Sequence, residues 1–227
     1  MTEHEREASP LIKSIPHTAL LIIDMQIYQA GMGGNLPRYL GAINGPEAEE
    51  GAIQRGKELV PVIRRLLSAF RAAGACVIFT AFGSLTEDGS DLVPYVRLWN
   101  RKCREMLGFP AIVSVSDAGY AILSDISPLA NEPVVNKTAQ GAFHSSVIDH
   151  VLKQRAVNTI VAAGMYTNHC VMATCIGAAD AGYRVIVPED AVGSWSLDLH
   201  KQSLSLMRSW VILTSSSRII EELETSP

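Results

Sequence analysis

Six short apolar runs alternate with longer amphipathic stretches, and this alternation constrains the fold more than any other feature of the sequence. The runs cover residues 19–23, 75–80, 133–136, 159–163, 183–187 and 210–214. Near-continuous hydrophobicity over about five residues is typical of a strand buried on both faces, as in a parallel sheet. Repeated strand–helix units favour right-handed crossovers with helices on both faces. The sequence therefore predicts an α/β protein with a three-layer, doubly wound parallel sheet.

The stretches between the runs carry apolar residues at helical spacing. They predict helices over residues 50–73, 92–107, 145–155, 168–181, 199–208 and 218–224. Gly74 and Gly182 each follow such a stretch and precede an apolar run, which is where a C-terminal helix cap belongs. Residues 30–46 and 83–91 have the least regular pattern. Either segment is expected to form a wall or lid over a site.

The composition is that of a globular domain of ordinary size rather than of a nucleic-acid-binding or membrane protein. We find no repeat, low-complexity tract or linker in the 227 residues, so we predict one domain over 1–227 with residues 1–16 as a loosely ordered extension. A net charge of −4 argues against a nucleic-acid partner. No apolar run approaches the roughly 20 residues that span a bilayer, and the polar start lacks a secretory pattern. The four scattered cysteines suggest reduced thiols. We therefore expect a cytoplasmic protein.

Three reactive side chains come just after apolar runs. Asp24 follows residues 19–23, Lys137 follows residues 133–136, and Cys170 begins the predicted helix after residues 159–163. Ligands bind beyond the carboxyl ends of the strands in open parallel sheets, so the three groups are expected to meet at one edge. A lysine and a helix N-terminus both favour a thiolate, and a carboxylate can carry its proton. This placement indicates a cysteine nucleophile.

Each of these residues also has a structural interpretation. Asp24 fits a turn or cap after a strand, Lys137 fits a solvated surface position, and Cys170 fits the core side of an Ala/Val-rich helix. Cys175 lies five residues further along that helix and is expected in the core. Topology alone leaves these alternatives open.

At these residues the chain resembles the isochorismatase-like cysteine hydrolases, which include N-carbamoylsarcosine amidohydrolase, nicotinamidases, and ureidoacrylate and biuret hydrolases. The shared motifs read ALLIIDMQ at 19–26, VNK at 135–137, AGMYTNHCV at 163–171 and AGYRVIVPEDA at 181–191. The resemblance runs from about Thr18 to Val211. It implies six parallel strands in the order 3-2-1-4-5-6, and a homo-oligomer such as a dimer or tetramer.

The resemblance also assigns roles within the site. It implies that Cys170 is the nucleophile, Asp24 the general acid/base and Lys137 the charge that positions the pair. It further implies a cis peptide bond between Met165 and Tyr166. That bond would turn the Tyr166 N–H toward the Cys170 N–H to form an oxyanion hole. Apart from the resemblance, five residues are expected either to contact substrate or to pack in the core: Phe82, Trp99, Phe143, His169 and Trp195.

Departures from the family narrow the expected chemistry. Nicotinamidases carry metal-binding residues after the second strand, whereas residues 80–84 here read TAFGS, and the six histidines show no metal-ligand spacing. We therefore expect no metal and no cofactor. True isochorismatases lack a cysteine at the nucleophile position. The expected function is hydrolysis of a C–N bond in a small amide or ureide through a thioester. The alternatives are vinyl-ether hydrolysis or another reaction on this fold, or a non-catalytic oligomeric scaffold.

Overall fold

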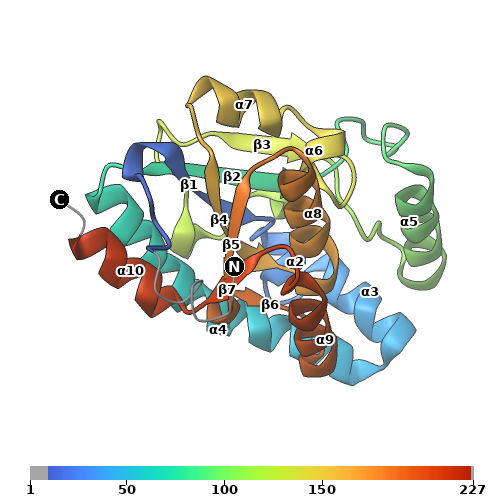
Figure 1. The fold of residues 1–227 in the computed structure, drawn as a ribbon. Coiled ribbons are helices and arrows are strands. Elements are labelled where there is room, and N and C mark those ends of the chain that lie inside the picture. Colours follow the sequence, from blue (N-terminus) through green and yellow to red (C-terminus); the bar gives the residue numbers. More distant parts are fainter. Residues whose placement is uncertain (1–9, 226–227) are drawn as a thin grey trace.

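The computed structural model describes residues 10–225 and contains a parallel sheet (Figure 1). Its strands are β1 Thr18–Ile23, β2 Cys76–Phe82, β3 Val134–Lys137, β4 Thr159–Met165, β5 Arg184–Pro188, β6 Val192–Gly193 and β7 Ile212–Thr214. The main order is β3-β2-β1-β4-β5-β7, and the two-residue β6 pairs with the end of β4. The predicted fold class and strand order are confirmed. The prediction of six strands missed only β6, which is too short to form an apolar run.

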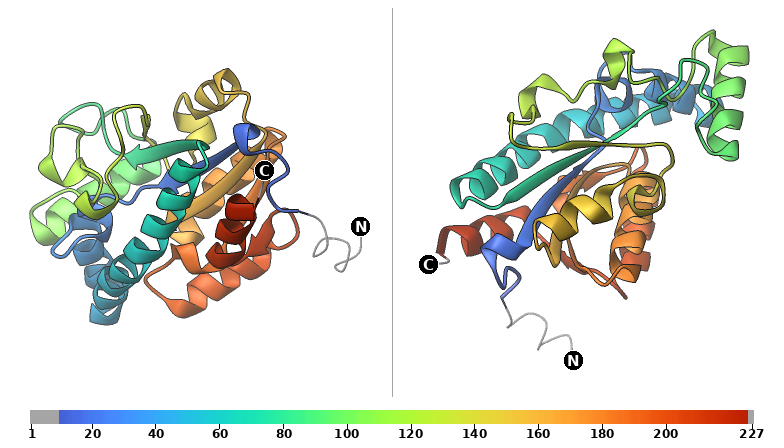
Figure 2. Two further views of the ribbon diagram at one scale, coloured as in Figure 1. Left: turned by 90° about the vertical axis from the view of Figure 1, so that its left-hand side faces the viewer. Right: turned by 90° about the horizontal axis from the view of Figure 1, so that it is seen from above.

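Nine α-helices occur in the described residues. They are α2 Ile27–Ala30, α3 Asn35–Asn44, α4 Pro46–Ala72, α5 Pro94–Leu107, α6 Ala142–Ser145, α7 Ile148–Gln154, α8 Met172–Asp180, α9 Leu197–Met207 and α10 Ser216–Thr225. The helices α4 and α10 pack together on one face of the sheet, and α7 and α8 cover the other (Figures 1 and 2). These are the three layers that the sequence predicts.

Local chemistry explains where the long helices begin and end. Helices α4 and α5 start with Pro46 and Pro94 at their first positions, where a missing N–H costs nothing. After α4 and α8, Gly74 and Gly182 adopt positive φ angles of 66° and 90° before the next strand. Glycine tolerates this conformation because it has no Cβ.

The segment from 30 to 46 differs from its predicted irregular character. It contains α3, whose Leu36, Tyr39 and Leu40 are buried at helical spacing. The glycines and the proline around this stretch obscured the pattern in the sequence. The segment from 83 to 91 does lack regular structure.

The N-terminal extension is partly packed on the domain. Leu11 and Ile12 are buried, and the Ile12 N–H donates to the Glu222 carboxylate in α10 at 2.9 Å. The expectation of a loosely ordered segment over 1–16 is thus wrong for these two residues, whose apolar side chains join the core. Residues 1–9 lie outside the described part of the chain.

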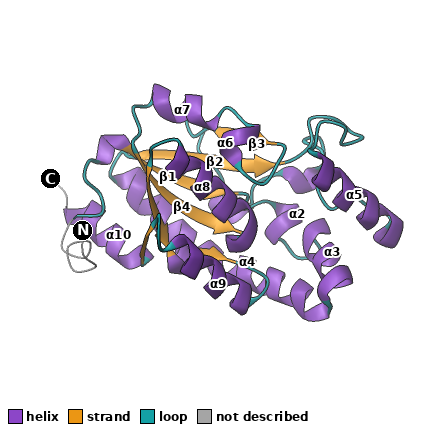
Figure 3. Ribbon diagram, turned by 45° about the vertical axis from the view of Figure 1, so that its right-hand side comes forward, coloured by secondary structure: helices purple, strands orange, loops and turns teal. Residues whose placement is uncertain are grey.

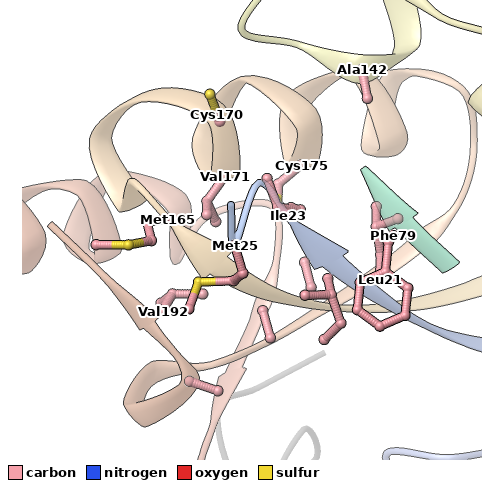
Figure 4. Packing of buried hydrophobic residues seen from close by; sticks show 14 of the residues in the cluster. Leu21, Ile23, Met25, Phe79, Ala142, Met165, Cys170, Val171, Cys175 and Val192 are labelled. Atoms are coloured by element: carbon pink, nitrogen blue, oxygen red, sulfur yellow. The ribbon is translucent and has the colours of Figure 1, made fainter. Parts of the chain in front are cut away.

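The core has its centre on β1 and β4, whose side chains are all buried. Cys175 is fully buried, as expected, and in Figure 4 it lies with Val171 over Ile23. The Cys170 side chain points away from Cys175 in the same view. Two thiols five residues apart are therefore directed to different surroundings.

The carboxyl ends of four strands lie at one edge of the sheet. Ile23 at the end of β1 pairs with Thr80 of β2 and with Gly164 of β4, and Phe82 pairs with Lys137. The strand arrows point toward the side where α2, α3 and α5 gather (Figure 3). This edge is where a ligand site is expected in such a fold.

Candidate active site

The side chains of Asp24, Lys137 and Cys170 meet at this edge. Lys137 Nζ lies 2.8 Å from Asp24 Oδ2 and 3.3 Å from Cys170 Sγ. Asp24 and Lys137 are fully buried, and Cys170 is 3% exposed. The structure thus brings together three residues that are far apart in sequence.

Neighbouring groups hold the two charged side chains in place. Thr80 Oγ1 donates to Asp24 Oδ1 at 2.8 Å, and Lys137 Nζ donates to the Ala139 carbonyl at 2.9 Å. Nζ also lies 4.1 Å from the centroid of the Phe82 ring, a cation–π contact. Asp24 directly follows β1 and takes up a φ of 53°, in the left-handed region. A buried ion pair with this many partners offsets the cost of taking both charges out of water.

The electrostatics keep the resting thiol protonated. Burial raises the pKa of Cys170 well above its usual value; Lys137 opposes this, while the charge of Asp24 and its hydrogen bond to the thiol add to it. Burial by itself disfavours the Lys137 ammonium, but Asp24 and Cys170 outweigh it and raise the lysine pKa. Lys137 does lower the thiol pKa, as expected, but in the resting site burial and Asp24 outweigh its effect. Formation of the thiolate then requires a proton acceptor.

The backbone around Cys170 is unusual. The peptide bond between Met165 and Tyr166 is cis, as the resemblance implies. A π-helical turn, Thr167–Val171, follows it and carries Cys170 into α8. The predicted helix start at 168 was therefore close, but its first turn is π rather than α. Short π-turns occur often at functional sites.

Gly164 allows β1 and β4 to come close just before this turn. Its φ is 126°, and a Cβ at this position would lie 2.1 Å from the Ile23 carbonyl oxygen. Since Ile23 and Gly164 pair across the two strands, a side chain here would separate Asp24 from the turn that carries Cys170.

A cavity of about 250 Å³ opens beside Cys170. Its lining residues come from α2, α3, α5, the end of β2, Tyr166 and the π-turn after β4, and the loops at Ile112, Gln140 and Trp195. They are Gln29, Leu36, Tyr39, Leu40, Ile43, Asn44, Phe82, Trp99, Ile112, Gln140, Tyr166, His169, Cys170 and Trp195. The segment from 30 to 46 does supply a wall, through α3. The cavity suits a small molecule with an apolar body.

Aromatic rings form one side of this cavity. The His169 ring lies 5.7 Å from Trp99 and 5.1 Å from Trp195, and Trp195 lies 5.3 Å from Tyr166. Burial, with a further contribution from Lys137, lowers the pKa of His169 to about 4. This imidazole is therefore neutral near pH 7. His169 reaches the cavity because it lies in the π-helical turn Thr167–Val171, next to Cys170.

Phe143 lies elsewhere. It is not among the residues that line the cavity; its ring packs 5.6 Å from Tyr183, and its Cβ lies against Gly177 in α8. The expectation that Phe143 contacts substrate is therefore corrected. The side chain instead fills the space between α6 and α8.

Sequence reasoning missed two groups of cavity residues. The apolar set on α3 had a readable signal, since Leu36, Leu40 and Ile43 repeat at helical spacing. Gln29 and Gln140 had none, because a single glutamine in a sequence carries no sign of where its amide lies.

Within residues 10–225, no three His, Cys, Asp or Glu side chains gather as a metal site would require. Thr80, the first residue of the TAFGS stretch, donates a hydrogen bond to Asp24. In the same range no helix is both long and apolar enough to cross a bilayer.

The fold and these three buried groups define a doubly wound α/β protein with a cysteine at the ligand-binding edge of its sheet. The profile of the isochorismatase domain matches residues 18–217, and the chain belongs to this family. A ureidoacrylate amidohydrolase, RutB of Azorhizobium caulinodans, is 30% identical over 190 residues, which cover 80% of this chain and 78% of that protein. RutB of Yersinia enterocolitica is 28% identical over 182 residues, 77% of this chain and 74% of that protein.

The fold has solved counterparts. A crystal structure of a cysteine hydrolase from Pseudomonas syringae pv. phaseolicola matches with a TM-score of 0.77. It is 23% identical and covers 96% of this chain and 99% of that one. The resemblance drawn from the motifs is thereby confirmed at the level of family and fold.

Proposed function

We propose that this protein is a cysteine-dependent hydrolase that cleaves a C–N bond, other than a peptide bond, in a small amide or ureide. The observation that carries the proposal is the buried contact set of Asp24, Lys137 and Cys170 beside a cavity of small-molecule size. Relatives that are named amidohydrolases support the class of bond.

The proposed reaction begins with transfer of the thiol proton. As Cys170 Sγ bonds to the substrate carbonyl carbon, its proton passes to Asp24. The raised pKa of Cys170 supports this order of events, because the thiol keeps its proton until an acceptor takes it during attack. Lys137 Nζ, 3.3 Å from Sγ, stabilises the negative charge that develops on sulfur.

The carbonyl oxygen becomes an oxyanion, for which we propose the backbone N–H groups of Tyr166 and Cys170 as donors. When the tetrahedral species collapses, the C–N bond breaks and Asp24 returns its proton to the departing amine. The acyl or carbamoyl group is left on Cys170 as a thioester. Water then attacks that carbonyl, gives a proton to Asp24 and releases the acid, and the proton returns to sulfur. Each cycle thus consumes one water and restores the thiol.

The alternative of vinyl-ether hydrolysis on a chorismate-type substrate has less support. Such a substrate carries carboxylates, and the cavity-lining residues include no lysine or arginine to bind them. A scaffold without catalysis would have no use for a buried ion pair in contact with a thiol at an open cavity. A homo-oligomer in the cytoplasm remains a prediction from the sequence.

The test of the proposed function is a pair of cysteine variants. Ammonia release is measured from nicotinamide, biuret, N-carbamoyl amino acids, ureidoacrylate analogues and simple amides. We expect Cys170→Ser to lower kcat/KM on any hydrolysed substrate by at least about a thousandfold, because a hydroxyl is far harder to deprotonate than a thiol. Cys175→Ser is the matched control: it changes a core thiol and should affect stability more than turnover. Near-normal turnover by Cys170→Ser would refute the proposal.

A further inference from the structure

One residue that lines the cavity carries a buried polar atom with no hydrogen-bond partner among the described residues. The atom is Oε1 of Gln29, in a side chain that is fully buried. Gln29 lines the cavity from α2. A buried acceptor left unsatisfied is unfavourable, so such atoms are rare unless a ligand or water completes their hydrogen bonds.

The orientation of this amide is fixed by a chain of hydrogen bonds. The Phe82 N–H donates to Gln26 Oε1 at 2.8 Å, and Gln26 Nε2 donates to the Tyr120 carbonyl at 2.8 Å. A backbone N–H can only donate and a carbonyl can only accept, so Gln26 cannot be flipped. Gln29 Nε2 in turn donates to Gln26 Oε1 at 2.9 Å. The other amide atom of Gln29, Oε1, is therefore an acceptor, and it has no partner among the described residues.

The cavity also lacks a partner for an anion. The residues that line it include no lysine, arginine, aspartate or glutamate, and His169 is neutral near pH 7. Among the described residues, Lys137 is the one lysine or arginine that is buried, and its ammonium already contacts Asp24, the Ala139 carbonyl and the thiol. A carboxylate on the acyl side of a substrate would be buried against apolar and aromatic groups at a cost of several kcal/mol.

We propose that this cavity selects an uncharged amide or ureide that donates an N–H hydrogen bond to Gln29 Oε1. This specificity rests on the proposed function, since it names the class of substrate for the Cys170 site. It separates this chain from relatives named for ureidoacrylate, which is an anion. In this role Gln29 is a specificity-determining residue: it contacts substrate and takes no part in bond cleavage.

The first test compares two ligands of similar shape and different charge. Binding is measured by calorimetry in a Cys170→Ala protein, so no turnover intervenes. The ligands are 4-methylpentanamide and succinamate, in which a carboxylate replaces the branched end. We expect the neutral amide to bind at least about a hundredfold more tightly, because the carboxylate finds no cation. Succinamate that binds equally well or better would overturn the proposal.

The second test addresses the acceptor. Pyrrole-2-carboxamide carries N–H donors, and 2-acetylfuran has the same shape without them. In the Cys170→Ala protein the ratio of their dissociation constants should favour the carboxamide, and Gln29→Met should reduce that ratio by about tenfold. Gln202→Met makes the same chemical change on the exposed side of α9 and should leave the ratio unaltered. An unaltered ratio in folded Gln29→Met would refute the role of Gln29.

The two tests separate this inference from the proposed function. They measure binding without the nucleophile, so they hold or fail whether or not the protein hydrolyses an amide. The ligand pair that differs in charge needs no substitution at Gln29 and remains informative if Gln29→Met does not fold. Loss of the proposed function would appear instead as hydrolysis that does not depend on Cys170.

Discussion

Cys170 lies between two charged partners that act on its thiol in opposite directions. Lys137 lowers the thiol pKa, whereas Asp24 raises it through its charge and through a hydrogen bond. Burial has the largest effect on the thiol pKa and raises it, as Asp24 does, so the two together keep the proton on sulfur at rest. This arrangement suits the proposed reaction, in which a proton moves between sulfur and carboxylate during attack.

This arrangement predicts opposite shifts in two variants. Asp24→Asn removes a negative charge and should lower the pKa of Cys170, so alkylation by iodoacetamide should reach its full rate at lower pH. Lys137→Met removes a positive charge and should move that profile to higher pH. Both variants should lose hydrolysis, the first because the proton carrier is gone. The measurement is the alkylation rate at Cys170 against pH.

The control is the double variant Asp24→Asn/Lys137→Met. It removes one negative and one positive charge, so the net charge of the pair is unchanged. It also tests whether either single change acts by unfolding the protein. A Lys137→Met profile that coincides with wild type, or that moves to lower pH, would place the lysine outside the group that controls the thiol.

At the scale of elements, the close approach of β1 and β4 sets the site. Gly164→Ala would place a Cβ 2.1 Å from the Ile23 carbonyl at a φ of 126°, so it should destabilise the protein by about 3 kcal/mol or more. Gly182→Ala is the matched control. Its φ is 90°, but nothing lies within 4 Å of the added Cβ, and it should cost about 1 kcal/mol. Urea unfolding measures both. Equal losses in the two variants would show that strand contact does not govern position 164.

The sequence predicts the elements well where their hydrophobic pattern is uninterrupted. Each of the six apolar runs overlaps a strand of the sheet; Asp24 directly follows β1, as predicted, and Lys137 is the last residue of β3. The helix α3 escaped prediction because glycines surround it and Pro37 lies within it, although Leu40 and Ile43 keep helical spacing. A helix with an interrupted hydrophobic pattern is recognised only in the structure, from its packing on neighbouring elements.

Properties that depend on how deeply an individual side chain is buried could not be predicted from the sequence. The protonated state of Cys170 and the neutral His169 both follow from desolvation, which depends on the residues of α3 and α5 that close over the site. Phe143 shows the same limit: its place near the motif suggested the cavity, but its ring packs on Tyr183. The unpaired oxygen of Gln29 emerges only when a whole hydrogen-bond chain is followed.

At the scale of the whole molecule, the proposed chemistry is complete with side chains and backbone. Asp24 carries the proton, Lys137 supplies the charge, and no step calls for a Lewis acid. We therefore expect turnover to survive exhaustive dialysis against EDTA, measured as ammonia release before and after metal analysis of the protein. Activity that is lost to the chelator and restored by a divalent ion would contradict this account of the site.

The central claim is that Cys170 carries the acyl group of the substrate as a thioester. The most direct measurement is mass spectrometry of the protein after rapid acid quench during turnover of an amide that it hydrolyses, with hydroxylamine added in a parallel sample. We predict a mass increase equal to the acyl group on the peptide that contains Cys170. We also predict its disappearance with hydroxylamine as the acyl hydroxamate forms. Steady hydrolysis with no adduct on Cys170 and no hydroxamate, under conditions in which a standard thioester survives the quench, would contradict the account.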